Sequence, residues 1–177
     1  MGNTAINTLP ERITAYRAYK NGKDLMGVVD VELPKVAYLT ETLKGAGILG
    51  EMETPSVGQT KPLEVKITFR TPETDMINLM DCVGHDIEFR SAIQKFDAAS
   101  GSRSFDQDRV IIRGFPSETE LPKLESGGGS SSISLNCVYL KYEKNGVTLL
   151  EIDKLNYKFV VNGNDSLATI REALGLI

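Results

Sequence analysis

Cys82 and His85 are the residues whose types and spacing come closest to a catalytic pair. A thiol within reach of an imidazole can act as a nucleophile with its base, and Cys-x-x-His can supply half of a zinc site. His85 is the only histidine, and Cys137, the second cysteine, lies far along the chain and completes no Cys-x-x-Cys pair. We therefore expect two buried, reduced thiols, with a disulfide as the less favoured alternative, and predict no metal site and no enzymatic activity.

Glu151 and Asp153 are a second group that could do chemistry, because residues two apart on a strand share one face. Paired carboxylates can act as general acid and base, or bind one edge of a Ca²⁺ ion. The surrounding sequence has no metal-loop spacing and no glycosidase-like pattern. We expect structural ion pairs or a bulge contact instead, with Arg171, Lys154 and backbone groups as partners.

The run Gly45–Gly50 matches the pattern G-x-G-x-x-G of dinucleotide sites. Such a site needs a helix and a βαβ unit after the glycines, whereas the following segment contains Pro55 and Gly58 and no helical stripe. We predict no cofactor, and expect residues 40–61 to form a long irregular loop. Apolar residues in that loop would be odd on a free surface, so we expect a partner to cover them: Leu43, Ile48, Leu49 and Met52.

Composition limits the remaining functions. The chain has 177 residues, the size of one domain, and a net charge of −4. An acidic protein is poorly suited to gripping nucleic acid, although nucleic acid could pass along its surface. No apolar run approaches the roughly 20 residues of a membrane span, and residues 1–12 lack the apolar core of a secretion signal. We expect no direct membrane binding, and a loose arm over residues 1–12 before one domain over 13–177.

Alternating and turn-forming patterns predict a mainly β fold. Leu63–Arg70 alternates apolar and polar residues throughout, and Asn-Gly pairs follow three other strand-like runs. Strands are predicted over 14–20, 24–33, 63–70, 86–96, 109–115, 133–143 and 147–161, with a bulge or bend near Asp153. Helices are predicted from Thr71-Pro72-Glu73 to Gly84 and over 166–174, and a mobile loop with a Gly/Ser tip over 117–132.

We therefore predict a small antiparallel β-barrel or sandwich with a flanking helix and a short C-terminal helix. In the first predicted helix, we expect a buried stripe formed by Met76, Met80 and Val83, broadened by Ile77 and Leu79. In the second, we expect Leu167, Ile170 and Leu174 to face inward.

A set of spaced residues resembles a known family. The set comprises Leu33-Pro34-Lys35, Leu43, Gly45-Ala46-Gly47 and Gly50 near the front, then Cys137, Tyr139, Asn145-Gly146, Leu149, Glu151, Ile152, Asp153, Asn156, Val161, Asn162, Gly163, Asp165, Leu167, Arg171 and Leu174-Gly175-Leu176. In these positions the chain resembles the major tail tube protein of contractile-tailed bacteriophages and of phage-tail-like bacteriocins. The arm over 1–12 and the Gly/Ser tip depart from that pattern.

The resemblance implies a structural virion protein in the phage tail, assembled in the cytoplasm of the host bacterium. Copies would form hexameric rings whose sheets join around a channel, and the rings would stack around a tape-measure protein. The contractile sheath would enclose this tube, the baseplate and tail terminator proteins would be further partners, and DNA would only transit the lumen.

The resemblance also assigns roles to particular residues. The loop that reaches the neighbouring ring would be 40–61, and its central residues are Leu43, Gly45, Ala46, Gly47, Ile48, Leu49 and Gly50. Structural family positions are Glu151, Asp153, Asn156, Asn162, Gly163 and Asp165. Three acids lie on outward faces of alternating strands, and such a face could meet either the lumen or the sheath. They are candidates for the lumen, where they would repel phosphate: Asp30, Glu32 and Glu64.

Three alternatives stay open at this point. The chain could form the tube of a tail-like bacteriocin or of a type VI secretion system. It could instead be a small barrel with a ligand bound inside. An enzyme that uses Cys82 and His85 is the third alternative.

Overall fold

The computed structural model describes residues 8–22, 24–27, 29–71, 73–123 and 129–176. Residues 1–7 of the expected arm, Pro72, and Gly127 and Gly128 of the Gly/Ser tip lie outside the described residues. The strands are β1 (Thr8–Lys20), β2 (Asp24–Leu25), β3 (Val29–Glu32), β4 (Tyr38–Lys44), β5 (Glu51–Thr60), β6 (Leu63–Phe69), β7 (His85–Asp97), β8 (Arg103–Glu120), β9 (Ser131–Lys144), β10 (Val147–Asp153), β11 (Lys158–Val161) and β12 (Asn164–Asp165). The described helices are α1 (Thr74–Leu79) and α2 (Ala168–Ala173).

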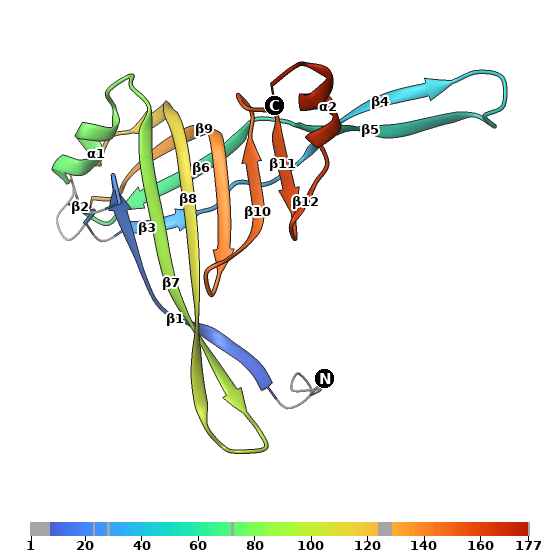
Figure 1. Ribbon diagram of the computed structural model, residues 1–177. Helices are drawn as coiled ribbons and strands as arrows, with labels where there is room; N and C mark the ends of the chain where they lie inside the picture. The colour runs from blue at the N-terminus through green and yellow to red at the C-terminus, as the bar shows by residue number, and fades with distance from the viewer. Residues whose placement is uncertain (1–7, 23, 28, 72, 124–128, 177) are drawn as a thin grey trace.

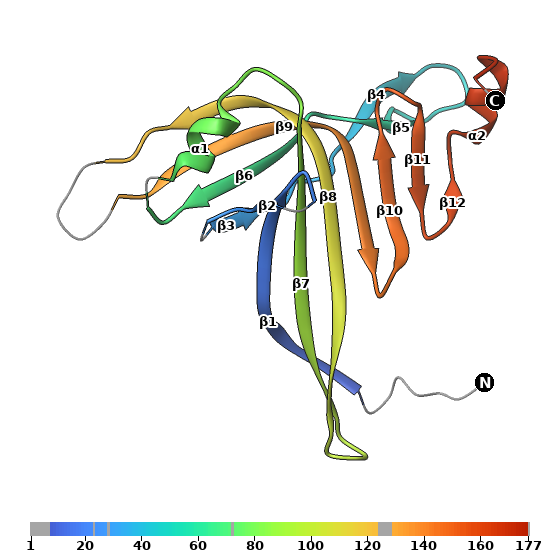
Figure 2. The ribbon, with the colours of Figure 1, turned by 60° about the vertical axis from the view of Figure 1, so that its left-hand side comes forward.

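One antiparallel sheet contains all of these strands except β4 and β5, which pair with each other. Its main path runs β12-β11-β10-β9-β8-β7-β1-β2. Opposite β8, the first half of β9 pairs with β6 and the second half with β10, so β6 and β3 leave the main path at β9. We call β3 and β6 one branch of the sheet, and the main path, which includes β1, β7 and β8, the other branch. The branches curve around a common interior, with α1 at one end (Figures 1 and 2). This is the barrel- or sandwich-like architecture that the sequence predicts.

The core lies between the two branches. Leu63, Val65, Ile67 and Phe69 are each 0% exposed, which confirms the predicted alternation in β6. Burial of each such side chain contributes about 1.5–3 kcal/mol of transfer free energy. The other core residues come from both branches and α1, and include Met76, Leu79, Ile87, Phe89, Val110, Ile112, Ile133, Leu135, Leu140, Ile152 and Phe159.

The Asn-Gly turns are confirmed. Asn21, Asn145 and Asn162 have φ values of 53°, 49° and 48°, and each is followed by a glycine with positive φ. Two consecutive residues with positive φ match the twist of an antiparallel hairpin, and this is why Asn-Gly predicts it so well. These turns connect β1 to β2, β9 to β10, and β11 to β12.

The expected irregular loop over 40–61 is wrong, because this segment is a β-hairpin. Strands β4 and β5 pair from Tyr38↔Thr60 to Lys44↔Glu51, and the hairpin extends away from the main sheet (Figure 1). Since the two strands contact core residues only at the base of the hairpin, the sequence has no sustained apolar alternation to indicate it. Pro55 and Gly58 suggest a loop in the sequence. The hairpin tolerates Pro55 because both strands of a two-stranded sheet are edge strands, and it tolerates Gly58 because the register shifts there. From here on, 'the arm' means residues 38–60 and not the N-terminal arm expected over residues 1–12.

Both helices are shorter than predicted. α1 has Glu73 as its N-cap, and the Thr71 hydroxyl donates to the Glu73 carboxylate (2.8 Å) instead of capping the helix. Only Met76 and Leu79 of the predicted stripe are buried, because the helix ends at Leu79. The exposed members are Ile77, Met80 and Val83. In α2, Leu167 at the N-cap is buried as expected, whereas Ile170 and Leu174 are exposed.

Strand ends also differ from the predictions. β1 begins at Thr8, inside the loose arm expected over residues 1–12. Two strands extend into the loop expected over 117–132: β8 continues to Glu120, and β9 begins at Ser131. Partner strands supply the hydrogen bonds that make these polar ends regular. At Asp153 the chain makes a full turn from β10 to β11, not a bulge. The change of apolar phase there is the reversal of the strand.

Candidate assembly surfaces

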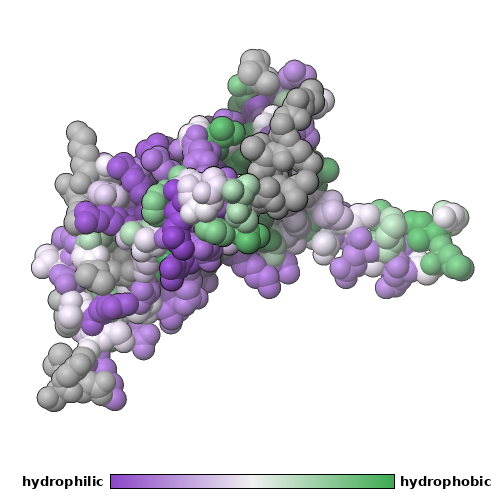
Figure 3. Space-filling model, turned by 90° about the horizontal axis from the view of Figure 1, so that it is seen from below, coloured by the Kyte–Doolittle hydropathy of each residue, from purple (hydrophilic) through white to green (hydrophobic). Residues whose placement is uncertain are grey.

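The arm is exposed along its length: every residue of β4 is exposed, and the residues of β5 are exposed or half-buried. Its tip, Gly45–Gly50, contains three glycines with positive φ, and the Ile48 amide donates to the Gly45 carbonyl (3.2 Å). Leu49 at the tip is 107% exposed, and the cross-strand partners Leu43 and Met52 are 43% and 46% exposed. Figure 3 shows apolar residues gathered at the end of the arm. The tip therefore presents apolar side chains that a folded monomer would normally bury.

The C-terminal segment contacts the base of the arm. The Lys154 ammonium donates to the Lys61 carbonyl (3.0 Å), and the rings of Tyr38 and Phe159 have centroids 6.0 Å apart. Gly58 of β5 lies directly against Leu167. These contacts position the arm relative to the main sheet.

The family positions in β10 and the following turn form local networks. Glu151 accepts a hydrogen bond from the Tyr139 hydroxyl (3.0 Å) and pairs with Lys158 (2.8 Å). Burial and the Glu151 carboxylate together raise the pKa of Tyr139 to about 12. Lys158, across the turn, takes the place that we expected for Arg171 or Lys154. In the turn, one Asp153 oxygen accepts from the backbone amides of Leu155 and Asn156 (3.0 and 2.9 Å).

The remaining family positions hold α2. Asn162 and Gly163 make the β11–β12 turn. Asp165 accepts from the Leu167 amide (3.1 Å) and pairs with Arg171 (2.6 Å), which also donates to the Tyr157 carbonyl (2.9 Å). Arg171 is the first cause of the lowered pKa of Asp165. The contacts of these positions hold the β10–β11 turn, the β11–β12 turn and α2 in place.

Asp30, Glu32 and Glu64 are exposed side chains on the β3–β6 branch. Asp30 accepts from the Tyr16 hydroxyl (2.7 Å) and lies 3.8 Å from Arg70. In the β3–β6 pair, Glu32 is opposite Lys66. The branch therefore carries these three acids together with two bases.

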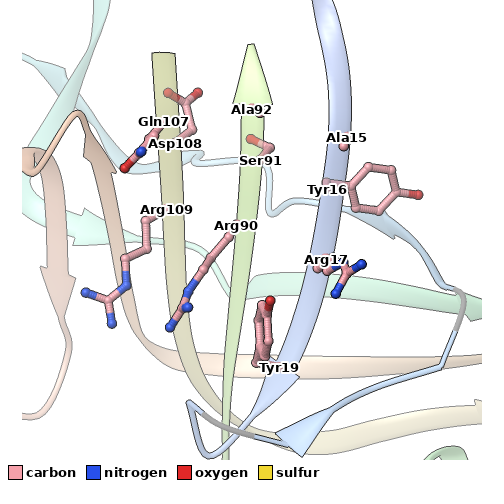
Figure 4. Close-up of a pocket in the computed structure, with 10 residues that line it drawn as sticks. All are labelled: Ala15, Tyr16, Arg17, Tyr19, Arg90, Ser91, Ala92, Gln107, Asp108 and Arg109. Atoms are coloured by element: carbon pink, nitrogen blue, oxygen red, sulfur yellow. The ribbon is translucent and has the colours of Figure 1, made fainter. Parts of the chain in front are cut away.

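A row of arginines that we did not predict crosses the other branch. Arg17, Arg90 and Arg109 are direct cross-strand partners on β1, β7 and β8 (Figure 4). They point away from the core, since their neighbours Ala18, Phe89 and Val110 point into it. The row depends on the register of three strands, so no local motif could have indicated it.

Glu88 neutralises part of this row. It is 3% exposed, pairs with Arg90, and accepts two hydrogen bonds from Arg109 (2.6 and 2.9 Å). Mainly because of Arg109, the pKa of Glu88 falls to about 2. Like charges directly opposite one another destabilise a sheet, so this buried carboxylate is what permits the row.

Cys82 and His85, the candidate catalytic pair, share no hydrogen bond in the described part of the chain. Cys82 is exposed, contrary to our expectation. The Nε2 atom of His85 is hydrogen-bonded to the Asp81 carbonyl oxygen (3.0 Å). Both cysteines are free thiols. No group of three or more potential metal ligands occurs among the described residues. Neither described helix has the length and apolarity that crossing a membrane requires.

β1 leaves much of one sheet edge open. β7 pairs with it along one side, whereas β2 covers only Tyr19 and Lys20 on the other. Within the described residues, no strand therefore pairs with the outer edge of β1 over 9–15. An open edge of this length is a template for another chain.

Comparisons with known proteins agree with this geometry. The tail tube protein of Escherichia phage P2 is 27% identical over 174 residues, which cover 95% of this chain and 99% of that protein. Two solved structures share the fold: the sheath–tube complex of an extracellular contractile injection system (12% identity, TM-score 0.54, 76% of this chain and 91% of the other) and the tube-terminating cap of the anti-feeding prophage (11% identity, TM-score 0.52, 76% and 93%). The family model "Phage tail tube protein FII" matches residues 10–175. The chain therefore belongs to the phage tail tube protein family, a family of structural components of phage tails.

Proposed function

We propose that this chain forms hexameric rings which stack into the inner tube of a contractile phage tail, and that DNA passes through this tube into the host. The observation that carries the proposal is an open sheet edge together with an exposed, apolar-tipped arm on one molecule. Family membership supports the tube, and the two surfaces suggest how copies join.

The open edge of β1 suggests contacts within a ring. Over residues 9–15 its backbone can form hydrogen bonds with a strand of a neighbouring copy, and a repeated head-to-tail contact of this kind closes into a ring. The opposite end of the sheet is the short strand β12, which leaves room for such a partner. One continuous sheet would then surround the channel.

The arm suggests contacts between rings. Leu49, Leu43 and Met52 would be buried in the next ring. Each Å² of apolar surface that becomes buried contributes about 25 cal/mol of favourable free energy, and this would favour stacking. At Gly45, Gly47 and Gly50 a Cβ atom would meet open space, so any need for glycine in this role would come from their positive φ. Ala46 and Ile48 complete the tip.

We place Asp30, Glu32 and Glu64 on the channel wall, where carboxylates would limit adhesion of the phosphate backbone. The described contacts give no reason to assign an enzymatic role or a cofactor. The sheath, tape-measure, baseplate and tail terminator proteins would be the partners of the assembled tube. Assembly would take place in the bacterial cytoplasm before the virion is released.

A tube that carries no genome is the second candidate, because the two solved structures come from an injection system and the anti-feeding prophage. The likeness to the phage P2 protein covers nearly the whole chain and favours the virion. A ligand-binding barrel has less support, since large side chains such as Phe69, Leu63 and Met76 fill the interior.

Negative-stain electron microscopy over a concentration series tests the proposal. We expect rings and hollow tubes, formed either by the purified protein or after addition of baseplate complexes as initiator. The proposal is contradicted if the particles stay monomeric both without and with baseplate complexes, while circular dichroism shows a folded β protein. DNA inside purified particles distinguishes the virion from the genome-free tube.

A further inference from the structure

A groove on the outer face of the β1–β7–β8 branch pairs a charged row with a row of small side chains. Its volume is about 590 Å³. The first row is Arg17, Arg90 and Arg109, and the second, two residues along each strand, is Ala15, Ala92 and Gln107. Figure 4 shows both rows on adjacent strands. Two residues along a strand correspond to about 7 Å, so the backbone of the alanine row lies about 7 Å along the strands from the backbone of the arginine row.

The row retains positive charge in spite of Glu88. Glu88 faces two arginines, and Arg109 also contacts Glu143 (3.5 Å). The Arg17 side chain is exposed, and within the described part of the chain its guanidinium group makes no hydrogen bond or ion pair. The groove therefore offers one guanidinium group that is ready to pair with a carboxylate from outside.

The arm carries the complementary pattern. Leu43 is opposite Met52, and Glu41 is opposite Thr54, so both pairs lie on the same face of the hairpin. They are two residues apart, which again gives a spacing of about 7 Å. A row of large apolar side chains next to an exposed carboxylate matches, in spacing and in charge, a floor of alanines next to arginines.

We propose that the groove receives the arm of a second copy of this chain, with Leu43 and Met52 on Ala15 and Ala92 and with Glu41 paired to Arg17. This inference rests on the proposed tube, and it specifies the surface that receives the arm. The small side chains leave space for the large ones, and the direction of the charge pair fixes the register of the contact.

A charge exchange between arm and groove tests the contact. Arg17→Glu places a second carboxylate against Glu41, and Glu41→Arg places a second guanidinium group against Arg17. Each single variant should raise the critical concentration for tube assembly by at least about tenfold, because like charges across an interface repel. The double variant should recover at least part of that loss. Lys35→Glu reverses an exposed charge outside the groove and is the matched control.

Ala92→Leu tests the floor separately from the charges. The leucine side chain would fill the space that the proposal gives to Leu43 of the second copy, so tubes should not form. Circular dichroism should show that the monomer is still folded. The contact is wrong if Arg17→Glu and Ala92→Leu assemble at the wild-type concentration, or if the double charge variant assembles no better than the worse single one. Failure of the wild-type protein to form tubes with initiator would instead contradict the proposed function itself.

Discussion

Gly58 and Leu167 meet so closely that a Cβ atom on Gly58 would lie 2.6 Å from Leu167 Cδ2. Gly58 also has a φ of +67°, which side chains disfavour. It lies where the register of the arm shifts, between the pairs Tyr38↔Thr60 and Thr40↔Pro55. The N-cap of α2 therefore packs on the backbone at the base of the arm. This contact couples the C-terminal segment to the direction of the arm.

Gly58→Ala should destabilise the monomer and impair assembly. The positive φ costs about 1–2 kcal/mol and the overlap with Leu167 about 1–3 kcal/mol more. Gly101 has the same φ of +67° with nothing within 4 Å of its Cβ position, so Gly101→Ala is the matched control and should show only the smaller cost. Urea denaturation measures both. Equal losses in the two variants would mean that the Leu167 contact is unimportant.

Local patterns predicted the parts of the fold that depend on local chemistry. The alternation over 63–70 predicts β6 because its two faces meet core and solvent, and Asn145-Gly146 predicts a hairpin because both residues accept positive φ. The arm was missed because a hairpin without a core face shows no alternation. Its glycines and Pro55 then suggest irregular structure.

The assembly surfaces were only partly predictable. The exposed apolar residues around Leu49 could be identified in the sequence, since their loop context made them unusual. The row of Arg17, Arg90 and Arg109 could not, because three segments far apart in sequence must pair in one register to create it. The contact between Gly58 and Leu167 is equally long-range.

Glu88 should make stability depend on pH in the acid range. Its pKa is about 2 in the folded protein against an ordinary value of 4.5, so its contribution is complete above 4.5 and is lost as the pH falls toward 2. The shift corresponds to at most about 3 kcal/mol. Glu88→Gln should therefore reduce the free energy of unfolding by about 2–3 kcal/mol at pH 7, and this deficit should shrink below pH 4.

Urea denaturation at pH 7, 4 and 3 measures this deficit. Glu64→Gln removes an exposed carboxylate and should change stability by less than about 0.5 kcal/mol at every pH. A deficit of Glu88→Gln that stays constant from pH 7 to pH 3 would show that its pairing with Arg109 and Arg90 does not depend on the charge of the carboxyl group.

The two thiols should react at very different rates. Cys82 is exposed, whereas Cys137 is 3% exposed and burial raises its pKa to about 11. Since the thiolate is the reactive form, a chromogenic disulfide reagent at pH 8 should titrate one thiol in the native protein and two in denaturant. Cys82→Ser should abolish the fast phase and Cys137→Ser the slow one. Two fast thiols, or none, would disagree with the structure.

The charge of the proposed channel wall can be changed without disturbing the core. Glu32 and Glu64 are exposed, so lysine at both positions should leave folding intact. Tubes should still assemble, but DNA should leave the particle more slowly, because a basic wall attracts phosphate, and added salt should weaken the effect. Glu32→Gln/Glu64→Gln is the neutral control. If the lysine variant ejects DNA at the wild-type rate in low salt, these acids do not face the channel.

The tip of the arm should be dispensable for folding and essential for assembly. Leu49 is fully exposed, so Leu49→Asp should change the free energy of unfolding by less than about 0.5 kcal/mol. It should nevertheless prevent stacking, because the carboxylate would have to be buried without a partner, while Leu49→Met keeps the apolar contact and should form tubes.

Gly47→Val tests the backbone of the same tip. Gly47 has a φ of +94° and open space around its Cβ position, so valine would change the tip conformation without a clash in the monomer. The melting temperature should stay near that of the wild type, and electron microscopy should show rings or monomers in place of tubes. Tubes of normal length in both Leu49→Asp and Gly47→Val would mean that rings join through another surface. In that case the exposed apolar tip must meet the sheath or another tail component, because the isolated chain leaves it uncovered.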